Sequence, residues 1–179
     1  RFNNSNSQTI DTCVIKVLGW HLPNNANEEP STETNKREYV SEPNFHGDKP
    51  YVLVMERGSK SLWHQLGTQR IAGCSVEKVV NIFQQAVMKV KELHDLKYVH
   101  CDLKPRNFLY VERDGSGNDE QLLLCDMDAA CSKNSQRDVT LKYSTGYCPP
   151  ELARCIFTTN GKLDKIDTSF DIWSLGVLL

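Results

Sequence analysis

The sequence predicts an α+β fold in which a small region of strands precedes a mainly helical region. Three observations lead to this prediction. Two short runs rich in β-branched residues, CVIKVL at 13–18 and YVLVME at 51–56, lie in the first third of the chain. A long stretch with helical spacing follows at about 76–95. Two more short apolar runs come next, and helix signals close the chain.

The composition is that of an ordinary globular protein. Of the 179 residues, 39% are hydrophobic and 25% are charged, and the formal net charge is -2. This charge provides no basic surface for nucleic acid, and no apolar run approaches the ~20 residues that a membrane span needs. We therefore expect neither nucleic acid nor a membrane as partner, and the oligomeric state stays unknown.

Cysteine usage and the chain ends give two further expectations. The seven cysteines are scattered and include no CxxC pair, whereas metal and disulfide frameworks usually show tighter spacing. We expect reduced thiols and a cytoplasmic or nuclear protein. The chain opens at Arg1 without a signal-peptide pattern and closes on the apolar run DIWSLGVLL. We therefore expect a fragment of a longer protein.

The first predicted region, residues 1–56, holds both strand-like runs and a polar insertion. From Pro23 to Pro50 the composition shifts to Asn, Glu, Ser, Thr and Pro, which can bury little surface, so this stretch is predicted to be a loop or insertion. Gly58 lies in a turn signal that follows the second run. The second region, 57–179, is predicted to be mainly helical.

The firmest element is a helix from about Val76 to Asp95. Ser75 is a suitable cap, because its side chain can accept a hydrogen bond from the first turn. Apolar residues then recur at spacings of three and four, which predicts a helix buried along a wide stripe. These are Val79, Phe83, Ala86, Val90 and Leu93.

A β-hairpin and two helices are predicted after this helix. The runs NFLYV at 107–111 and QLLLCD at 121–126 flank a DGSG turn signal. Residues 129–148 are mixed and polar, which indicates a loop. A short helix should open at Pro149-Pro150-Glu151, since Pro is tolerated in a first turn. A final helix should begin near Asp171.

Four motifs stand on these elements in a characteristic order: HCDLKPRNFL at 100–109, DMD at 126–128, CPPE at 148–151 and DIWSLG at 171–176. In that order they resemble the H-R-D-L-x-x-x-N, D-F-G and A-P-E motifs and the D-x-W-S-x-G helix of eukaryotic protein kinases. The resemblance extends over most of the chain. It implies part of a two-lobe kinase fold: the end of the N-lobe sheet (1–56), the hinge, and the first half of the mainly helical C-lobe (57–179).

The resemblance implies a phosphoryl-transfer site that uses ATP and Mg²⁺. Asp102 would orient the substrate hydroxyl and accept its proton, and Lys104 would reach the γ-phosphate. Asn107 and Asp126 would bind the metal, because magnesium prefers hard oxygen ligands. The predicted hairpin would bring Asn107 and Asp126 back to one place.

The resemblance also implies an adenine site at the hinge. Met55 would be the gatekeeper beside the nucleotide, and the backbone groups of Glu56 and Gly58 would hydrogen-bond the adenine. Leu109 would pack beneath the ring. Taken alone, YVLVMERG is equally the pattern of a core strand that ends in a glycine turn.

Two more residues complete the implied site. Asp171 would accept hydrogen bonds from the catalytic-loop backbone near His100 and fix that loop. Ser144 aligns with the hydroxyl residue that the family places beside the catalytic Asp. Together with Lys104, Ser144 implies a protein substrate with a Ser or Thr acceptor rather than Tyr.

The chain departs from the family pattern in several places. Cys101 replaces the Arg that in many kinases pairs with a phosphorylated loop, and a thiol cannot form that pair, so we expect no phosphate switch through residue 101. Asp128 replaces a Gly and adds a carboxylate near the metal motif. No G-x-G-x-x-G occurs, so the phosphate clamp is expected upstream of Arg1 and the 179 residues alone are expected to be inactive.

Two alternatives remain open. A small-molecule phosphotransferase of the aminoglycoside or choline type would suit Asp128, although Lys104-Pro105, CPPE and DIWSLG favour a protein kinase. A pseudokinase acting as a scaffold would suit Cys101 and Asp128. Against it, Asp102, Lys104, Asn107 and Asp126 together form a complete catalytic and metal set.

Overall fold

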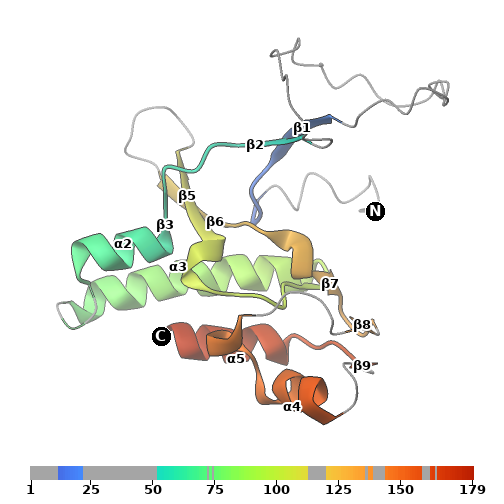
Figure 1. Ribbon diagram of the computed structural model, residues 1–179. Coiled ribbons are helices and arrows are strands. Elements are labelled where there is room, and N and C mark those ends of the chain that lie inside the picture. Colours follow the sequence, from blue (N-terminus) through green and yellow to red (C-terminus); the bar gives the residue numbers. More distant parts are fainter. Residues whose placement is uncertain are drawn as a thin grey trace, which may run out of the picture. The chain divides into compact units, whose positions relative to one another are not determined.

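The computed structural model describes residues 12–21, 52–71, 73, 75–112, 120–135, 137–138, 144–158, 162–163 and 165–179. The predicted 23–50 insertion and the DGSG turn lie outside these residues. In chain order (Figure 1) the elements are β1 (Val17–His21), β2 (Val52–Met55), β3 (Lys60–Ser61), α2 (Leu62–Gln69), α3 (Val76–Asp95), β4 (Tyr98–Val99), the 3₁₀ turn η2 (Pro105–Asn107), β5 (Phe108–Glu112), β6 (Glu120–Leu124), η3 (Met127–Ala129), β7 (Cys131–Ser132), β8 (Arg137–Asp138), η4 (Thr145–Tyr147), α4 (Pro150–Thr158), β9 (Lys162–Leu163) and α5 (Ser169–Leu178).

The chain divides into two compact units. One unit comprises Lys16–Arg57, and the other comprises Arg1–Ile15 together with Gly58–Leu179. Within the smaller unit, β1 and β2 form an antiparallel pair in which His21 lies opposite Val52. The strand predicted at 51–56 is therefore confirmed over Val52–Met55.

The strand predicted at 13–18 is displaced toward the C-terminus. β1 begins only at Val17, whereas Val14 forms an isolated parallel bridge with Leu124 of the larger unit. Two backbone hydrogen bonds hold this bridge, from Ile15 N to Leu124 O at 2.7 Å and from Leu124 N to Cys13 O at 2.8 Å. Cys13, Val14 and Ile15 are buried. The start of the run therefore pairs with β6 and its end pairs with β2. The β-branched composition does not reveal this division.

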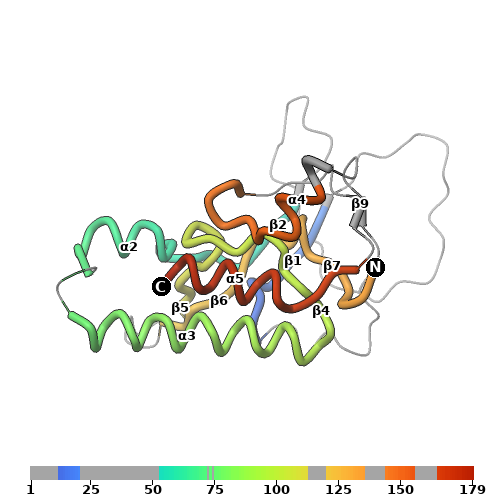
Figure 2. The backbone as a smooth tube through the Cα atoms, turned by 90° about the horizontal axis from the view of Figure 1, so that it is seen from below, coloured from blue at the N-terminus to red at the C-terminus, as the bar shows by residue number. Residues whose placement is uncertain are grey.

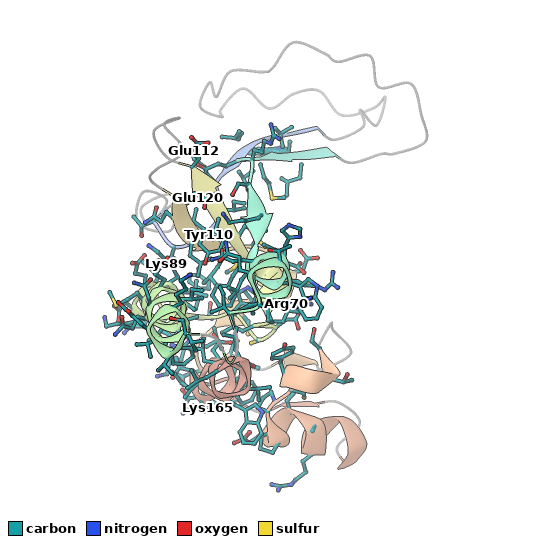
Figure 3. All side chains as sticks on the ribbon, turned by 90° about the vertical axis from the view of Figure 1, so that its left-hand side faces the viewer. Arg70, Lys89, Tyr110, Glu112, Glu120 and Lys165 are labelled. Carbon is teal, nitrogen blue, oxygen red and sulfur yellow. The ribbon has the colours of Figure 1, made fainter. Side chains whose placement is uncertain are left out.

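The core of the larger unit lies between helices α2, α3 and α5 and the β3-β5-β6 sheet. Figure 3 looks along these three helices and shows their side chains meeting between them, and α5 runs alongside α3 in Figure 2 as well. The buried cluster includes Leu62, Ala86, Leu93, Phe108 and Leu175. Burial of this apolar surface is the main favourable contribution to the stability of this unit.

Helix α3 confirms the prediction at both ends, since it runs from Val76 to Asp95. Its cap is Ser75, whose Oγ accepts a hydrogen bond from the Lys78 N–H at 3.3 Å. Ala86, Val90 and Leu93 are buried, as the apolar spacing predicts.

Replacing Ser75 by Ala should lower the free energy of unfolding by about 1 kcal/mol, because the Lys78 N–H loses its acceptor. Ser75→Gly is the matched control and should cost only a few tenths of that, since Gly is itself tolerated at a helix cap. Denaturant unfolding of the three proteins measures the difference. An Ala variant as stable as the parent would contradict this account of the cap.

Helix α2 is not foreseen by the sequence analysis. It follows β3 directly, and Ser61 caps it by accepting a hydrogen bond from the His64 N–H at 3.2 Å. In its eight residues only Leu62 is fully buried, while Leu66 packs partly against the core. One short helix of this kind gives too few turns for an apolar period to stand out.

The predicted hairpin is confirmed as β5 and β6. The two strands are antiparallel, with Phe108 opposite Leu124 and Glu112 opposite Glu120. β3 pairs with the other edge of β5, where Ser61 lies opposite Leu109. The hairpin therefore returns the chain, at Cys125, to the level of Asn107.

The segment predicted as the loop 129–148 contains short regular pieces. β7 pairs with β4, and β8 pairs with β9. Such two-residue strands come from pairing with distant segments and leave no local period. Helix α4 begins at Pro150 as predicted, and α5 begins at Ser169, slightly before Asp171. Within the described residues we find no helix with the length and apolarity needed to cross a bilayer.

Candidate active site

Asp171, in the first turn of α5, anchors the segment that carries the HCD motif. Its carboxylate is completely buried. Oδ2 accepts the His100 N–H at 2.8 Å, and Oδ1 accepts the Cys101 N–H at 2.9 Å. His94 on α3 contacts Oδ2 through Nε2, also at 2.8 Å. The hydrogen bonds predicted for Asp171 are present, and His94 is a partner that the sequence analysis missed.

The imidazole of His100 links this loop to the end of β6. Its Nε2 lies 3.1 Å from the carbonyl oxygen of Cys125, and its Nδ1 lies 3.3 Å from the Asp102 backbone N–H. A carbonyl can only accept and an N–H can only donate, so this arrangement requires the proton on Nε2 and a lone pair on Nδ1. His100 is therefore neutral and links the catalytic loop to Cys125, the residue preceding Asp126.

Asp102, Lys104 and Asn107 lie together, as the motif predicts. The buried Asp102 places Oδ2 2.6 Å from Lys104 Nζ. Asn107 Nδ2 donates to the Asp102 backbone carbonyl at 2.9 Å. With its nitrogen committed to the loop, the Asn107 amide can offer a cation only its oxygen.

The second carboxylate oxygen of Asp102, Oδ1, is buried and has no hydrogen-bond partner among the described residues. A buried acceptor without a donor is unfavourable unless a ligand supplies one. Lys104 Nζ, which holds the other oxygen, also donates to Ser144 Oγ at 3.0 Å. Ser144, expected beside Asp102, therefore contacts the same ammonium group as Asp102, a contact with Lys104 that the motif does not predict.

Asp126 follows β6 at the edge of this group. The Cys125 N–H donates to the Asn107 carbonyl at 2.9 Å, so the hairpin puts Asp126 one residue beyond the partner of Asn107. Asp126 has left-handed backbone angles, φ 60° and ψ 61°, and an exposed side chain. Such angles are uncommon outside glycine, although Asp is among the residues that tolerate them best.

The pKa of the Cys125 thiol depends on its burial and on the charges around it. Burial is the main cause that raises this pKa to about 11; the Asp126 carboxylate raises it further, and the Lys104 ammonium lowers it. Charges from the catalytic loop and from the DMD motif therefore act on the same thiol. The added Asp128 is exposed.

The residues predicted for the adenine site fall in both units. Met55, 46% exposed, and Glu56 belong to the Lys16–Arg57 unit, so their roles stay predictions. Gly58 and Leu109 belong to the larger unit and lie in contact. A Cβ on Gly58 would lie 3.3 Å from two Leu109 side-chain atoms, so a larger residue here would require Leu109 to shift slightly.

Arg106, between Lys104 and Asn107, is a further feature that the motif does not reveal. Its guanidinium lies 4.9 Å from the ring centre of Trp63 on α2, a cation–π arrangement. No group of three or more His, Cys, Asp or Glu side chains in the described part of the chain is arranged to hold a metal ion. The predicted metal ligands are one amide and one carboxylate, which is a smaller set.

Comparison with known proteins places these observations in a family. A family model described as the protein kinase domain matches residues 38–179. Human ribosomal protein S6 kinase alpha-3 is 38% identical over 92 residues, covering 50% of this chain and 11% of that protein. Ribosomal protein S6 kinase alpha-2 of Mus musculus is 32% identical over 140 residues, 75% of this chain and 17% of that protein.

A third relative is the serine/threonine-protein kinase MPS1 of Encephalitozoon cuniculi (strain GB-M1), 31% identical over 133 residues, or 74% of this chain and 21% of that protein. The chain thus spans about a tenth to a fifth of the length of these three proteins. The mixed helices and strands agree with the part of a two-lobe kinase fold that the sequence predicts. Because the family model covers most of its length, the chain belongs to the protein kinase family.

Proposed function

We propose that this protein transfers the γ-phosphate of ATP to a Ser or Thr hydroxyl of a protein substrate. One observation carries the proposal: Asp102, Lys104 and Asn107 form a single hydrogen-bonded group, which Asp171 anchors from beneath. The relatives that are named serine/threonine kinases support the same chemistry. On this proposal residues 1–56 belong to the N-lobe and residues 57–179 to the C-lobe.

Asp102 would accept the proton of the substrate hydroxyl. Its Oδ1 is buried without a donor among the described residues, so an incoming hydroxyl can satisfy it. As the acceptor oxygen attacks phosphorus, its proton passes to Asp102. Lys104 holds Oδ2 at 2.6 Å, and its ammonium group would balance charge on the γ-phosphate.

Asn107 and Asp126 fit the requirement for Mg²⁺, because an amide oxygen and a carboxylate are hard ligands and the metal keeps water for the remaining positions. The metal would neutralise phosphate charge in the bound nucleotide. The protein's own contribution is to hold these two residues at one end of the β5–β6 hairpin through the Cys125–Asn107 hydrogen bond. On this proposal Met55, Glu56, Gly58 and Leu109 would surround the adenine.

Asp126→Asn should raise the Mg²⁺ concentration needed for half-maximal phosphotransfer by at least about 10–100-fold, since that range is already typical for loss of an outer-shell partner of a metal ligand. Asp128→Asn is the matched control, since it removes an exposed carboxylate from the same motif. Titration of Mg²⁺ at saturating ATP measures both. Equal shifts in the two variants would contradict the assignment of the metal to Asp126.

The acceptor is tested with the full-length protein and labelled ATP. We expect phosphate on Ser- and Thr-containing proteins and none on Tyr-only peptides, aminoglycosides or choline. Ser144→Ala should reduce transfer, because Lys104 loses one of the two contacts that position it. Transfer to a small-molecule acceptor would favour the phosphotransferase alternative, and ATP binding without turnover would favour a scaffold.

A further inference from the structure

Several cysteines gather around a small second core. Val99, Leu152, Cys155, Ile166 and Phe170 are buried there, and Cys101, Cys131 and Cys148 pack against them. Within this cluster the Sγ atoms of Cys101 and Cys131 lie 3.6 Å apart. Nothing in the proposed phosphotransfer reaction uses these two thiols.

The pairing of β4 with β7 brings the two cysteines close together. β4 and β7 are antiparallel, and Val99, two residues before Cys101, lies opposite Cys131. The Cys101 N–H is fixed on Asp171 at 2.9 Å. To bond, the sulfurs must close from 3.6 Å to about 2.05 Å.

We propose that Cys101 and Cys131 are a redox modification site, at which a peroxide converts the two thiols into a reversible disulfide between the catalytic loop and β7. The deprotonated thiol of one cysteine attacks a peroxide oxygen, which breaks the O–O bond, gives a sulfenic acid and releases water once protonated. The second thiol then attacks the sulfenic sulfur, forms the S–S bond and releases a second water. In total two thiols lose two electrons and two protons, and one hydrogen peroxide becomes two waters.

The positions of Cys101 and Cys131 in the chain determine which segments a disulfide would connect. Cys101 immediately precedes Asp102, and Cys131 begins β7, five residues after Asp126. Cys101 also has a left-handed φ of 65°, which is uncommon outside glycine. A disulfide would tie the loop bearing the proposed proton acceptor to the strand that follows the proposed metal ligand.

Two other thiols in the described residues serve for comparison. Burial raises the pKa of Cys125 to about 11 and raises the pKa of Cys148, so both are mainly protonated at neutral pH. The thiolate is the reacting form. Cys125 and Cys148 therefore serve as matched controls, one near the catalytic loop and one in the same cluster.

Non-reducing peptide mapping of the full-length protein tests the site. The protein is treated with hydrogen peroxide, blocked with an alkylating agent and digested with trypsin. Cys101 then lies in the peptide 98–106, because Pro105 prevents cleavage after Lys104, and Cys131 lies in 114–133. We expect these two peptides to be joined, with a combined mass lighter by two hydrogens, and dithiothreitol to separate them.

Variants decide which sulfurs react, because 114–133 also contains Cys125. The cross-link should persist in Cys125→Ser and Cys148→Ser and disappear in Cys101→Ser and Cys131→Ser. Circular dichroism melting of the reduced variants excludes loss through unfolding. In the parent, peroxide should raise Tm reversibly, because a cross-link restricts the unfolded chain.

The proposal is overturned if peptides 98–106 and 114–133 stay separate while the thiols are oxidised singly, or if the bond maps to Cys125. The readout requires no catalysis. A protein that forms the bond but transfers no phosphate would reject the proposed function alone, and an active kinase without the bond would reject this inference alone.

Discussion

Asp102→Asn should lower kcat for phosphotransfer by about 100- to 10,000-fold, the usual contribution of a general base. The amide keeps the size of the side chain and one oxygen but cannot take the acceptor's proton. The buried Asp102 touches Lys104 at 2.6 Å, so the change also weakens the hold on that ammonium group. ATP binding should persist, because the nucleotide is proposed to lie against other residues.

Single-turnover phosphotransfer and nucleotide titration on the full-length protein measure these two effects separately. Asp95→Asn is the control, since Asp95 lies on the exposed face of α3, where it forms an ion pair with the solvent-exposed Lys91. We expect the control to match the parent. Unchanged turnover in Asp102→Asn would remove the general base from the proposal and would favour a scaffold function.

Asp171→Ala should lower the free energy of unfolding by about 3–5 kcal/mol, because it leaves buried donors without their acceptor. The donors are the backbone N–H groups of His100 and Cys101, and His94 also loses its partner. The His100 N–H is fully buried, whereas the Cys101 N–H and His94 are partly buried. Denaturant unfolding, followed by fluorescence and by circular dichroism, measures the loss.

Asp171→Asn separates positioning from stability. The amide preserves one acceptor oxygen for the loop and replaces the other by a donor that faces the His100 or the Cys101 N–H. We expect a folded protein with reduced kcat and an ATP affinity close to that of the parent, because residue 171 would position Asp102 without touching substrate. A fully active Asp171→Asn protein would show that the loop needs no such anchor.

The site was predictable where its residues are neighbours in sequence. Asp102, Lys104 and Asn107 lie within one short motif, so their spacing alone brings them together once the loop folds. The long helix was equally predictable, since Val76–Asp95 contains several turns of one apolar period. The β5–β6 hairpin followed from two apolar runs on either side of a turn signal.

Other contacts could not be predicted because they join distant segments without a local pattern. His94 and Asp171 are 77 residues apart in the chain, and the two thiols of Cys101 and Cys131 are 30 apart. The short helix α2 and the shift of β1 to Val17–His21 depend likewise on which surfaces the rest of the chain offers.

The amino-acid sequence by itself determined which chemistry we propose, because a carboxylate, an ammonium group and an amide at short spacing in one loop are properties of residue types. Only the tertiary structure decided that His94 joins Asp171 in holding that loop and which thiols meet beside it. The physical reason is that buried hydrogen bonds and sulfur contacts depend on packing, and packing brings together residues whose separation along the chain carries no periodic signal.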